Sequence, residues 1–251
     1  MSDPAGCKYL EWDSDFFAMR IGRVSESALD AEKVIRVRAW AAQERIDCLY
    51  FLCPLADTAS IQTAEKAGFF LTDIRVTFGT VLGGGGNPKP EATPRIRRQM
   101  PGDITALKAI AGAFHQQTRF FADPHFPKPL CGKLYETWME KSCASATSQV
   151  LVASSPDGAA QGYITCDVPE DGAPGSIGLV GVAEAARKTG LGRELVLASL
   201  RHFEARGCPM ATVVTQGQNI AAQRLYQSCG FVTQSIEAWL HCWPGKNPKA
   251  V

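Results

Sequence analysis

The stretch that most constrains this chain runs from Val180 to Arg193 and reads Val-Gly-Val-Ala-Glu-Ala-Ala-Arg-Lys-Thr-Gly-Leu-Gly-Arg. The β-branched run from Ile177 to Val182 predicts a buried strand, and the apolar spacing from Leu191 onward is typical of a helix. The start of a helix carries backbone N–H groups without partners and a partial positive charge, and glycine lets a ligand approach them closely. We therefore predict a phosphate cradle over residues 187–192.

Two common phosphate loops are excluded by their residues. A loop that ends in Gly-Lys-Ser/Thr is absent, and so is the three-glycine fingerprint of dinucleotide-binding folds. Short glycine motifs also occur where a strand, a turn and a helix merely pack closely together. Taken alone, this stretch supports a packing corner as well as an anion site.

Length and composition limit the class of protein. The 251 residues suggest one or two domains, and a hydrophobic content of 45% is enough for a packed core. A net charge of +1 gives no reason to expect nucleic acid or an anionic membrane as a partner. No apolar run approaches the roughly 18 residues that span a bilayer, and residues 1–7 do not resemble a signal peptide.

The nine cysteines show no metal-binding or disulfide pattern. There is no Cys-x-x-Cys pair, and the four histidines do not lie beside cysteines at ligand spacing. An odd number of scattered cysteines is typical of free thiols in a reducing compartment. We therefore expect a cytoplasmic protein with mostly buried thiols and no metal.

A glycine- and proline-rich stretch divides the chain. Residues 83–94 contain four consecutive glycines followed by three prolines, which is typical of a linker. This predicts a small N-terminal α/β domain over residues 1–82 and a second domain over residues 95–251. Periodicity and turn residues predict helices at about 29–45, 59–67, 104–114, 129–143, 191–206 and 219–229, and strands at 47–54, 69–81, 96–100, 150–154, 161–168, 177–182, 210–215 and 231–243.

The two halves share a weak internal repeat. Aligned on Gly68 and Gly230, two segments both predict a helix, then Gly-Phe, then a strand, with Ala64 opposite Tyr226. One hypothesis is a tandem of related folds in which only the second copy kept its chemistry. Coincidence is the alternative, because helix–glycine–strand junctions are common.

A second motif follows the glycine loop after one helix and one strand. It runs from Asn219 to Phe231 and reads Asn-Ile-Ala-Ala-Gln-Arg-Leu-Tyr-Gln-Ser-Cys-Gly-Phe. Together with Arg187-x-x-Gly-x-Gly192, it resembles the coenzyme A motifs of the GNAT acyltransferases. The resemblance implies an α+β GNAT fold: a central mixed, mostly antiparallel sheet flanked by helices, here preceded by the smaller α/β domain, which would be a degenerate GNAT-like copy if the repeat is real.

Two further segments resemble a narrower group. They are Leu10-Glu-Trp-Asp-Ser-Asp-Phe-Phe and Thr118-Arg-Phe-Phe-Ala-Asp-Pro-His-Phe-Pro. Both look like segments of the dTDP-fucosamine (dTDP-4-amino-4,6-dideoxygalactose) acetyltransferase group, which also carries a small N-terminal domain. The long linker is a departure from that group.

The resemblance implies acetyl-CoA as acyl donor and assigns residues to its binding. The pantetheine arm would lie along a strand edge where neighbouring strands splay, and the backbone amides from about residue 188 to residue 193 would bind the pyrophosphate. The coenzyme A-binding residues implied in this way are Val180, Gly181, Val182, Arg187, Lys188, Thr189, Gly190, Leu191, Gly192, Arg193 and Asn219. For the basic side chains a solvated role is the alternative, and for Asn219 a plain helix cap is the alternative.

Tyr226 is the candidate general acid. A phenol can protonate a departing thiolate if its O–H is directed at the sulfur. The alternative is a core tyrosine whose hydroxyl merely needs a partner. The general base is not identified by the sequence: Asp123, His125, Asp167 and Glu184 are candidates, for each of which a structural or solvated role is the alternative.

The acceptor is the least constrained part of the prediction. Arg119 and His125 lie in a segment that resembles the sugar-nucleotide group, so they are candidate substrate contacts. The leading hypothesis is an N-acetyltransferase acting on the amino group of a nucleotide-linked sugar. The alternatives are a GNAT enzyme acting on another amine (an amino acid, a polyamine, an antibiotic or a protein N-terminus) and a coenzyme A-binding module without catalysis; a homodimer is a possible assembly.

Overall fold

The computed structural model describes residues 6–83, 95–114, 118–169 and 172–245. The helices are α1 (Glu11–Phe17), α2 (Ala31–Gln43), α3 (Thr58–Lys66), α4 (Ile104–Phe114), α5 (Arg119–Ala122), α6 (Lys128–Ala144), α7 (Leu191–Ala205) and α8 (Ile220–Ser228), with short 3-10 turns η1 (Pro101–Asp103) and η2 (Glu184–Ala186). The strands are β1 (Cys7–Tyr9), β2 (Ile21–Val24), β3 (Cys48–Pro54), β4 (Phe70–Val81), β5 (Ile96–Arg98), β6 (Ser148–Ser154), β7 (Ala160–Asp167), β8 (Gly175–Val182), β9 (Met210–Gln216) and β10 (Val232–Cys242). Every predicted helix and strand is therefore present, whereas α1 lies in a segment for which no periodicity was found.

The described chain forms two compact units that are not contiguous in sequence. The first unit contains residues 1–75, 117–130 and 235–251, and the second contains residues 76–116 and 131–234. The last strand, expected in the second domain, contributes most of its length to the first unit. The contiguous domains 1–82 and 95–251 thus remain a prediction about domain organisation, and the linker at 83–94 lies outside the described residues except for Gly83.

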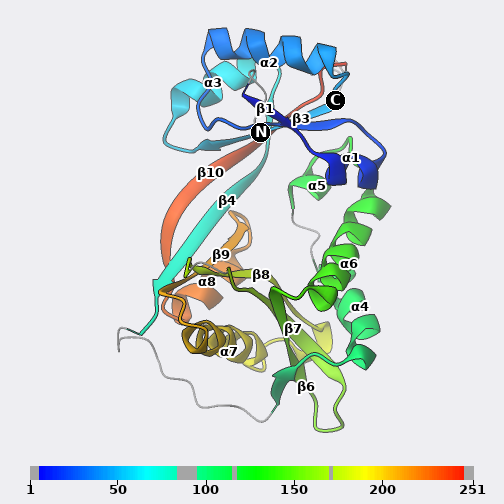
Figure 1. Ribbon diagram of the computed structural model, residues 1–251, viewed down its shortest axis with the longest axis vertical. Helices are drawn as coiled ribbons and strands as arrows, with labels where there is room; N and C mark the ends of the chain where they lie inside the picture. Colours follow the sequence, from blue (N-terminus) through cyan, green and yellow to red (C-terminus); the bar gives the residue numbers. More distant parts are fainter. Residues whose placement is uncertain (1–5, 84–94, 115–117, 170–171, 246–251) are drawn as a thin grey trace. The chain divides into compact units, whose positions relative to one another are not determined.

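The first unit is a sheet with one apolar face and one polar, aromatic face. Its strands lie in the order β1-β2-β3-β10-β4, with β2 parallel to β3 and β10 antiparallel to β3. Alternate residues such as Leu49, Phe51 and Leu240 form the core under α2 and α3 (Figure 1). Because side chains alternate along a strand, the intervening residues, Tyr50 and His241 among them, point to the other face.

The second unit is built on a mainly antiparallel sheet. Strands β5, β6, β7 and β8 pair antiparallel in sequence order, and β9 joins parallel to β8. Helix α7 lies on one side of these strands and α4 and α6 lie on the other (Figure 1). The leucine-rich stripe of α7 is fully buried, including Leu191, Leu195 and Phe203. The mixed sheet flanked by helices confirms the predicted α+β fold class.

The segments β3–α3–β4 and β9–α8–β10 have the same local structure. Asp57 and Asn219 each cap a nine-residue helix by accepting a hydrogen bond from the N–H three residues on. The backbone bonds that enter and leave these helices also correspond, at residues 57, 61, 68 and 69 in one segment and 219, 223, 230 and 231 in the other. A constant shift of 162 positions relates all of them, which supports the internal repeat.

Each helix of the repeat ends as the sequence predicts. Gly68 and Gly230 adopt left-handed conformations with φ of +85° and +91°. Only glycine adopts this conformation without strain, so it stops the helix and redirects the chain into the following strand.

In the described residues, no helix has the length and apolarity needed to cross a bilayer.

Candidate functional site

The edge of β8 is open where the resemblance implies a ligand. Strand β8 pairs with β9 at Gly175↔Ala211, Ser176↔Thr212 and Ile177↔Val213, where the register ends, although β8 continues to Val182. On its other side β8 pairs with β7 through to Gly162↔Val182. The β9 side of residues 178–182 therefore offers backbone groups to an extended ligand, and the contact with the pantetheine arm stays a prediction.

The turn that follows β8 leads into α7, whose N-terminus has no side-chain cap among the described residues. Gly190 is the N-cap of α7, with φ +88°, and no side chain in the described part of the chain caps this helix. Lys188 is also left-handed, with φ +63°. The first-turn N–H groups have no partner within the helix and carry the positive end of its dipole. The arrangement fits an anion such as a pyrophosphate group.

In the first unit α2 corresponds to α7, and an acidic side chain caps its N-terminus. There, Asp30 precedes α2 and its carboxylate accepts a hydrogen bond of 2.8 Å from the N–H of Lys33. The Ser60 hydroxyl oxygen accepts a hydrogen bond of 2.9 Å from the N–H of Leu29, which stabilises the same turn. A carboxylate at the N-cap repels an anionic ligand, so the start of α2 lacks the phosphate-binding geometry found at the start of α7.

The two motifs found in the sequence meet in the second unit. A Cβ placed on Gly192 would lie 3.3 Å from Cδ2 of Leu225, so the first turn of α7 packs closely against α8. Asn219 accepts a hydrogen bond from Ala222 N at 3.2 Å, which makes it the cap of α8. The cap role of Asn219 is therefore observed, and its contact with coenzyme A stays a prediction.

The predicted basic side chains lie on the exposed turn. Arg187, Lys188 and Arg193 are all exposed, and Arg187 Nε donates to Val182 O at 3.4 Å. The hydroxyl of Thr189 donates to Ala186 O at 2.7 Å, so it stabilises the turn itself. The three basic side chains are therefore placed where they could add positive charge at the edge of an anion site.

Tyr226 is buried, but its hydroxyl has no hydrogen-bond partner among the described residues. The side chain is 5% exposed and lies between Phe78 and Phe231, with ring centroids 6.1 and 5.9 Å away. Burial raises the pKa of the phenol, which keeps it protonated at neutral pH. This favours a proton donor over a core tyrosine with a satisfied hydroxyl.

The other candidate residues, Asp123, His125 and Arg119, belong to the first unit. Asp123 is fully buried and its carboxylate accepts four hydrogen bonds. Oδ1 accepts from the backbone and Nδ1 of His125 at 2.9 and 3.0 Å. Oδ2 accepts from His241 Nδ1 at 2.7 Å and from Trp243 Nε1 at 3.0 Å.

These bonds fix the charge state of the buried group. Burial alone would raise the pKa of Asp123, but the hydrogen bonds from His241, His125 and Trp243 outweigh it and bring the pKa to about 2. Burial lowers the pKa of His241 to about 4, although Asp123 opposes the shift. His241 is therefore neutral at pH 7, with its proton on Nδ1 and a lone pair on Nε2.

Arg119 lies at the free end of this chain of bonds. Its Nη1 donates to Nε2 of His241 at 3.0 Å, and its guanidinium lies 4.0 Å from the Tyr50 ring centroid and 4.4 Å from that of Trp239. The sequence singled out Arg119, His125 and Asp123 but gave no sign of His241 or Tyr50. No local pattern links Asp123 to a histidine 118 residues further on.

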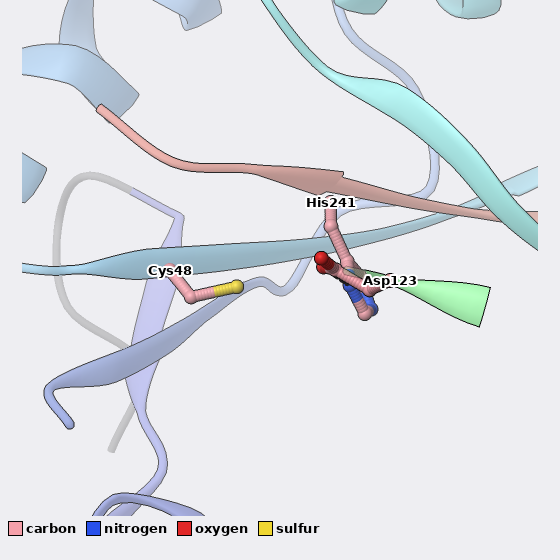
Figure 2. Close-up of side chains that lie close together, drawn as sticks. All are labelled: Cys48, Asp123 and His241. Carbon is pink, nitrogen blue, oxygen red and sulfur yellow. Dashed lines mark hydrogen bonds and ion pairs between the residues drawn. The ribbon is translucent and has the colours of Figure 1, made fainter. Parts of the chain in front are cut away.

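Cys48 completes a group that could be mistaken for a metal site. Ligand atoms of Cys48, Asp123 and His241 lie within 4.8 Å of one another, and Figure 2 shows the Cys48 sulfur directed toward the other two side chains. The ligand atoms of Asp123 and His241 are already engaged in hydrogen bonds. Burial raises the pKa of Cys48 well above its usual value, which disfavours the thiolate that binds metals. The group fits a structural network better than a metal centre.

The two remaining base candidates belong to the second unit and face solvent. Asp167 lies at the exposed end of β7 and Glu184 lies in η2, after β8. Neither is buried, and neither has a hydrogen bond to a histidine among the described residues. All nine cysteines are free thiols and eight of them are buried, as predicted.

Comparison with known proteins agrees with this geometry. Residues 115–231 match the model of the acetyltransferase (GNAT) family. The spore coat polysaccharide biosynthesis protein SpsD of Bacillus subtilis is 24% identical over 149 residues, which cover 59% of this chain and 50% of that protein. A mycothiol acetyltransferase of Thermobispora bispora is 42% identical over 67 residues, 27% of this chain and 23% of the relative. The chain thus spans half or less of these relatives.

Solved structures share the fold over nearly the whole chain. A GCN5-related N-acetyltransferase from Sphaerobacter thermophilus has a TM-score of 0.66 at 16% identity, covering 95% of this chain and 76% of that one. A tandem GNAT protein from the clavulanic acid biosynthesis pathway has a TM-score of 0.59 at 13% identity, covering 90% and 76%. The shared structures show that this chain has a GNAT fold, and the match to the acetyltransferase (GNAT) family model covers a little less than half of its residues.

Proposed function

We propose that the protein is an N-acetyltransferase that transfers the acetyl group of acetyl-CoA directly to a primary amine. The observation that carries this proposal is the second unit itself. It combines an open β8 edge, an α7 start that no described side chain caps, and a buried tyrosine whose hydroxyl has no hydrogen-bond partner in the described part of the chain. These are the three elements that a held thioester, a bound pyrophosphate and a protonated leaving group require.

Coenzyme A would bind along β8 and at the start of α7. Backbone groups of Val180 to Val182 would contact the pantetheine arm, and the amides of residues 188–193 would contact the pyrophosphate. Substitution at Gly192 would move Leu225 and with it the first turn of α7. The exposed Arg187, Lys188 and Arg193 would add charge at the rim.

Tyr226 would protonate the departing thiolate. The phenol is protonated at neutral pH because burial raises its pKa. The same burial raises the pKa of thiols in this unit, as at Cys229. A thiolate leaving into such surroundings is therefore a stronger base than in water, which makes proton transfer from the phenol favourable.

No side chain of the protein is assigned as the base. Asp123 accepts hydrogen bonds from His125, His241 and Trp243. Asp167 and Glu184 are exposed. We propose that a water chain deprotonates the amine, which suits an acceptor that is already largely neutral.

The acceptor we propose is the amino group of a nucleotide-linked amino sugar. Support comes from the resemblance of two segments to the dTDP-fucosamine acetyltransferase group and from similarity to a spore coat polysaccharide biosynthesis protein. Arg119 and His125 are the candidate substrate contacts. The comparison with mycothiol acetyltransferases leaves other amines open.

The test is turnover of acetyl-CoA by the full chain with a panel of amines, which includes a dTDP-linked amino sugar, simple amino acids and polyamines. Tyr226→Phe should lower kcat by about 10²–10⁴ while the Kd for coenzyme A stays unchanged. Tyr9→Phe is the control, because Tyr9 lies in the first unit and contacts Arg20. Near-normal turnover by Tyr226→Phe would remove the assignment of the acid. Coenzyme A binding without turnover of any amine would contradict the enzymatic function.

A further inference from the structure

The first unit contains a cavity of about 420 Å³. Its walls come from α2, from residues 66–69 at the end of α3, from Leu49 of β3 and from residues 242–244 at the end of β10, all of which belong to this unit. Exposed lining residues such as Ala42 and Pro244 place its mouth at the surface. The volume lies within the range of small-molecule sites, about 300–1,000 Å³. The acetyl transfer proposed above does not use this cavity.

The interior of the cavity is apolar. Val37, Ala41, Leu49 and Phe69 line it, and each of these side chains is at most 5% exposed. The thiol of Cys242 also lines it, and burial raises the pKa of this thiol to about 11, so it carries no charge at neutral pH. An apolar cavity offers water few hydrogen bonds and takes up apolar molecules readily. These walls therefore suit an alkyl chain.

The mouth of the cavity is positively charged. Arg38 and Lys66 are the charged residues among those that line it, and both are exposed. Nη2 of Arg38 donates to Ala67 O at 3.1 Å, which holds the guanidinium at the mouth and leaves its other N–H groups for an acceptor. Neither cation forms an ion pair with another described side chain, whereas Arg36, also on α2, pairs with Glu32. The cavity thus combines an apolar interior with two cations that pair with no carboxylate in the described part of the chain.

We propose that this cavity binds a medium-chain fatty carboxylate, with the alkyl chain in the apolar interior and the carboxylate at Arg38 and Lys66. Burial of the chain supplies the affinity, and charge-assisted hydrogen bonds from the guanidinium orient the head group. An ammonium head group would be repelled by the two cations, and an uncharged ligand would make no use of them. The inference does not depend on acetyl transfer, because the cavity shares no residue with the open edge of β8, the start of α7 or Tyr226.

The experiment is an NMR titration of the full chain with octanoate and with 1-octanol, which has the same chain length and no charge. Both ligands should shift the amide signal of Gly68 and the indole signal of Trp243, since both residues line the cavity. Arg38→Gln and Lys66→Gln should each weaken octanoate binding about threefold, and the double variant about tenfold, with 1-octanol binding unchanged. Arg36→Gln is the matched control, because it removes a cation of α2 that does not line the cavity, and it should change neither affinity.

A second pair of variants tests the cavity itself. Ala42→Phe places a large side chain at the mouth and should weaken the binding of both octanoate and 1-octanol at least tenfold. Ala39→Phe is the matched control, because Ala39 is exposed on the same helix but does not line the cavity. Both positions are exposed in α2, so both variants should fold.

The proposal is overturned if the wild type does not bind octanoate, or if neither the charge variants nor Ala42→Phe weaken its binding. Octanoate binding that appears only in a chain shortened to end at Gly245 would assign the cavity to the chain's own last residues, and would also overturn it. So would a dimer that Ala42→Phe dissociates and octanoate does not, because a second copy would then be the occupant. Coenzyme A affinity and acetyl transfer are measured separately, so failure of either proposal is recognised independently.

Discussion

Replacing Asp123 with asparagine tests the buried network of the first unit. The two side chains have the same shape, but asparagine has one acceptor oxygen and one NH₂ group where aspartate has two acceptors. Trp243 Nε1–H donates to one oxygen and the backbone N–H of His125 donates to the other. Both are donors in every protonation state. In either orientation of the asparagine amide, its NH₂ group therefore faces one of these two donors and loses that hydrogen bond.

The expected cost follows from the bonds that are lost. At least one hydrogen bond to an ionised acceptor disappears, which contributes about 1.5–3 kcal/mol, and the remaining bonds lose their charge assistance. The buried position also loses the negative charge that faces Arg119 through His241. Breaking a buried ionic arrangement by removing one partner typically costs about 3–5 kcal/mol. We therefore expect the free energy of unfolding of the first unit to fall by about 3–5 kcal/mol in Asp123→Asn.

Urea unfolding followed by tryptophan fluorescence measures this change. Trp12, Trp40, Trp239 and Trp243 belong to the first unit, so the signal reports mainly on it. With an m-value of about 1–3 kcal/mol/M, the midpoint should fall by at least about 1 M. Asp15→Asn, an exposed carboxylate on α1, should stay within about 0.5 kcal/mol of the wild type. A change below about 1 kcal/mol in Asp123→Asn would refute the account of this network.

Two further predictions concern the α7 start and the buried histidine. Gly190→Ala should destabilise the protein by about 1–2 kcal/mol, because φ is +88°, and should weaken coenzyme A binding about tenfold; Gly158→Ala has the same φ in the β6–β7 turn and should share the stability loss without changing coenzyme A affinity. His241 should titrate near pH 4 by NMR and stay neutral above it, because burial favours the uncharged ring; a titration near the ordinary value of 6.5 would contradict its burial against Arg119.

The sequence predicts elements well where the signal is local. The turn glycines, the strand runs and the stripe of α7 are decided by residues within about ten positions of one another, and each lies where it was expected. Helix α1 was not predicted because its aromatic residues show no helical period. Phe17 packs instead on Phe120 and Phe126, from a segment a hundred residues away. The division into units was not predictable for the same reason, since it depends on β10 pairing with β3.

The candidate site residues also differ in how well the sequence predicts their proximity. The α7 cradle, Asn219 and Tyr226 lie within one strand–helix–strand–helix stretch, so their spacing in sequence predicts their proximity. The network around Asp123 joins β3, α5 and β10, and no spacing in the sequence predicts it. Asp123 and His125 stay untested as candidates for a base; the observed hydrogen bonds join both His125 and His241 to Asp123.

The repeat gives this division a physical basis. The position of Tyr226 in the second unit corresponds to Ala64 in the first, and the open helix start of α7 corresponds to a start filled by the carboxylate of Asp30. A copy without the hydroxyl and without the free N–H groups has neither a proton donor nor a pyrophosphate cradle in these places. Its polar face carries instead the hydrogen-bonded network that joins Asp123, His241 and Arg119.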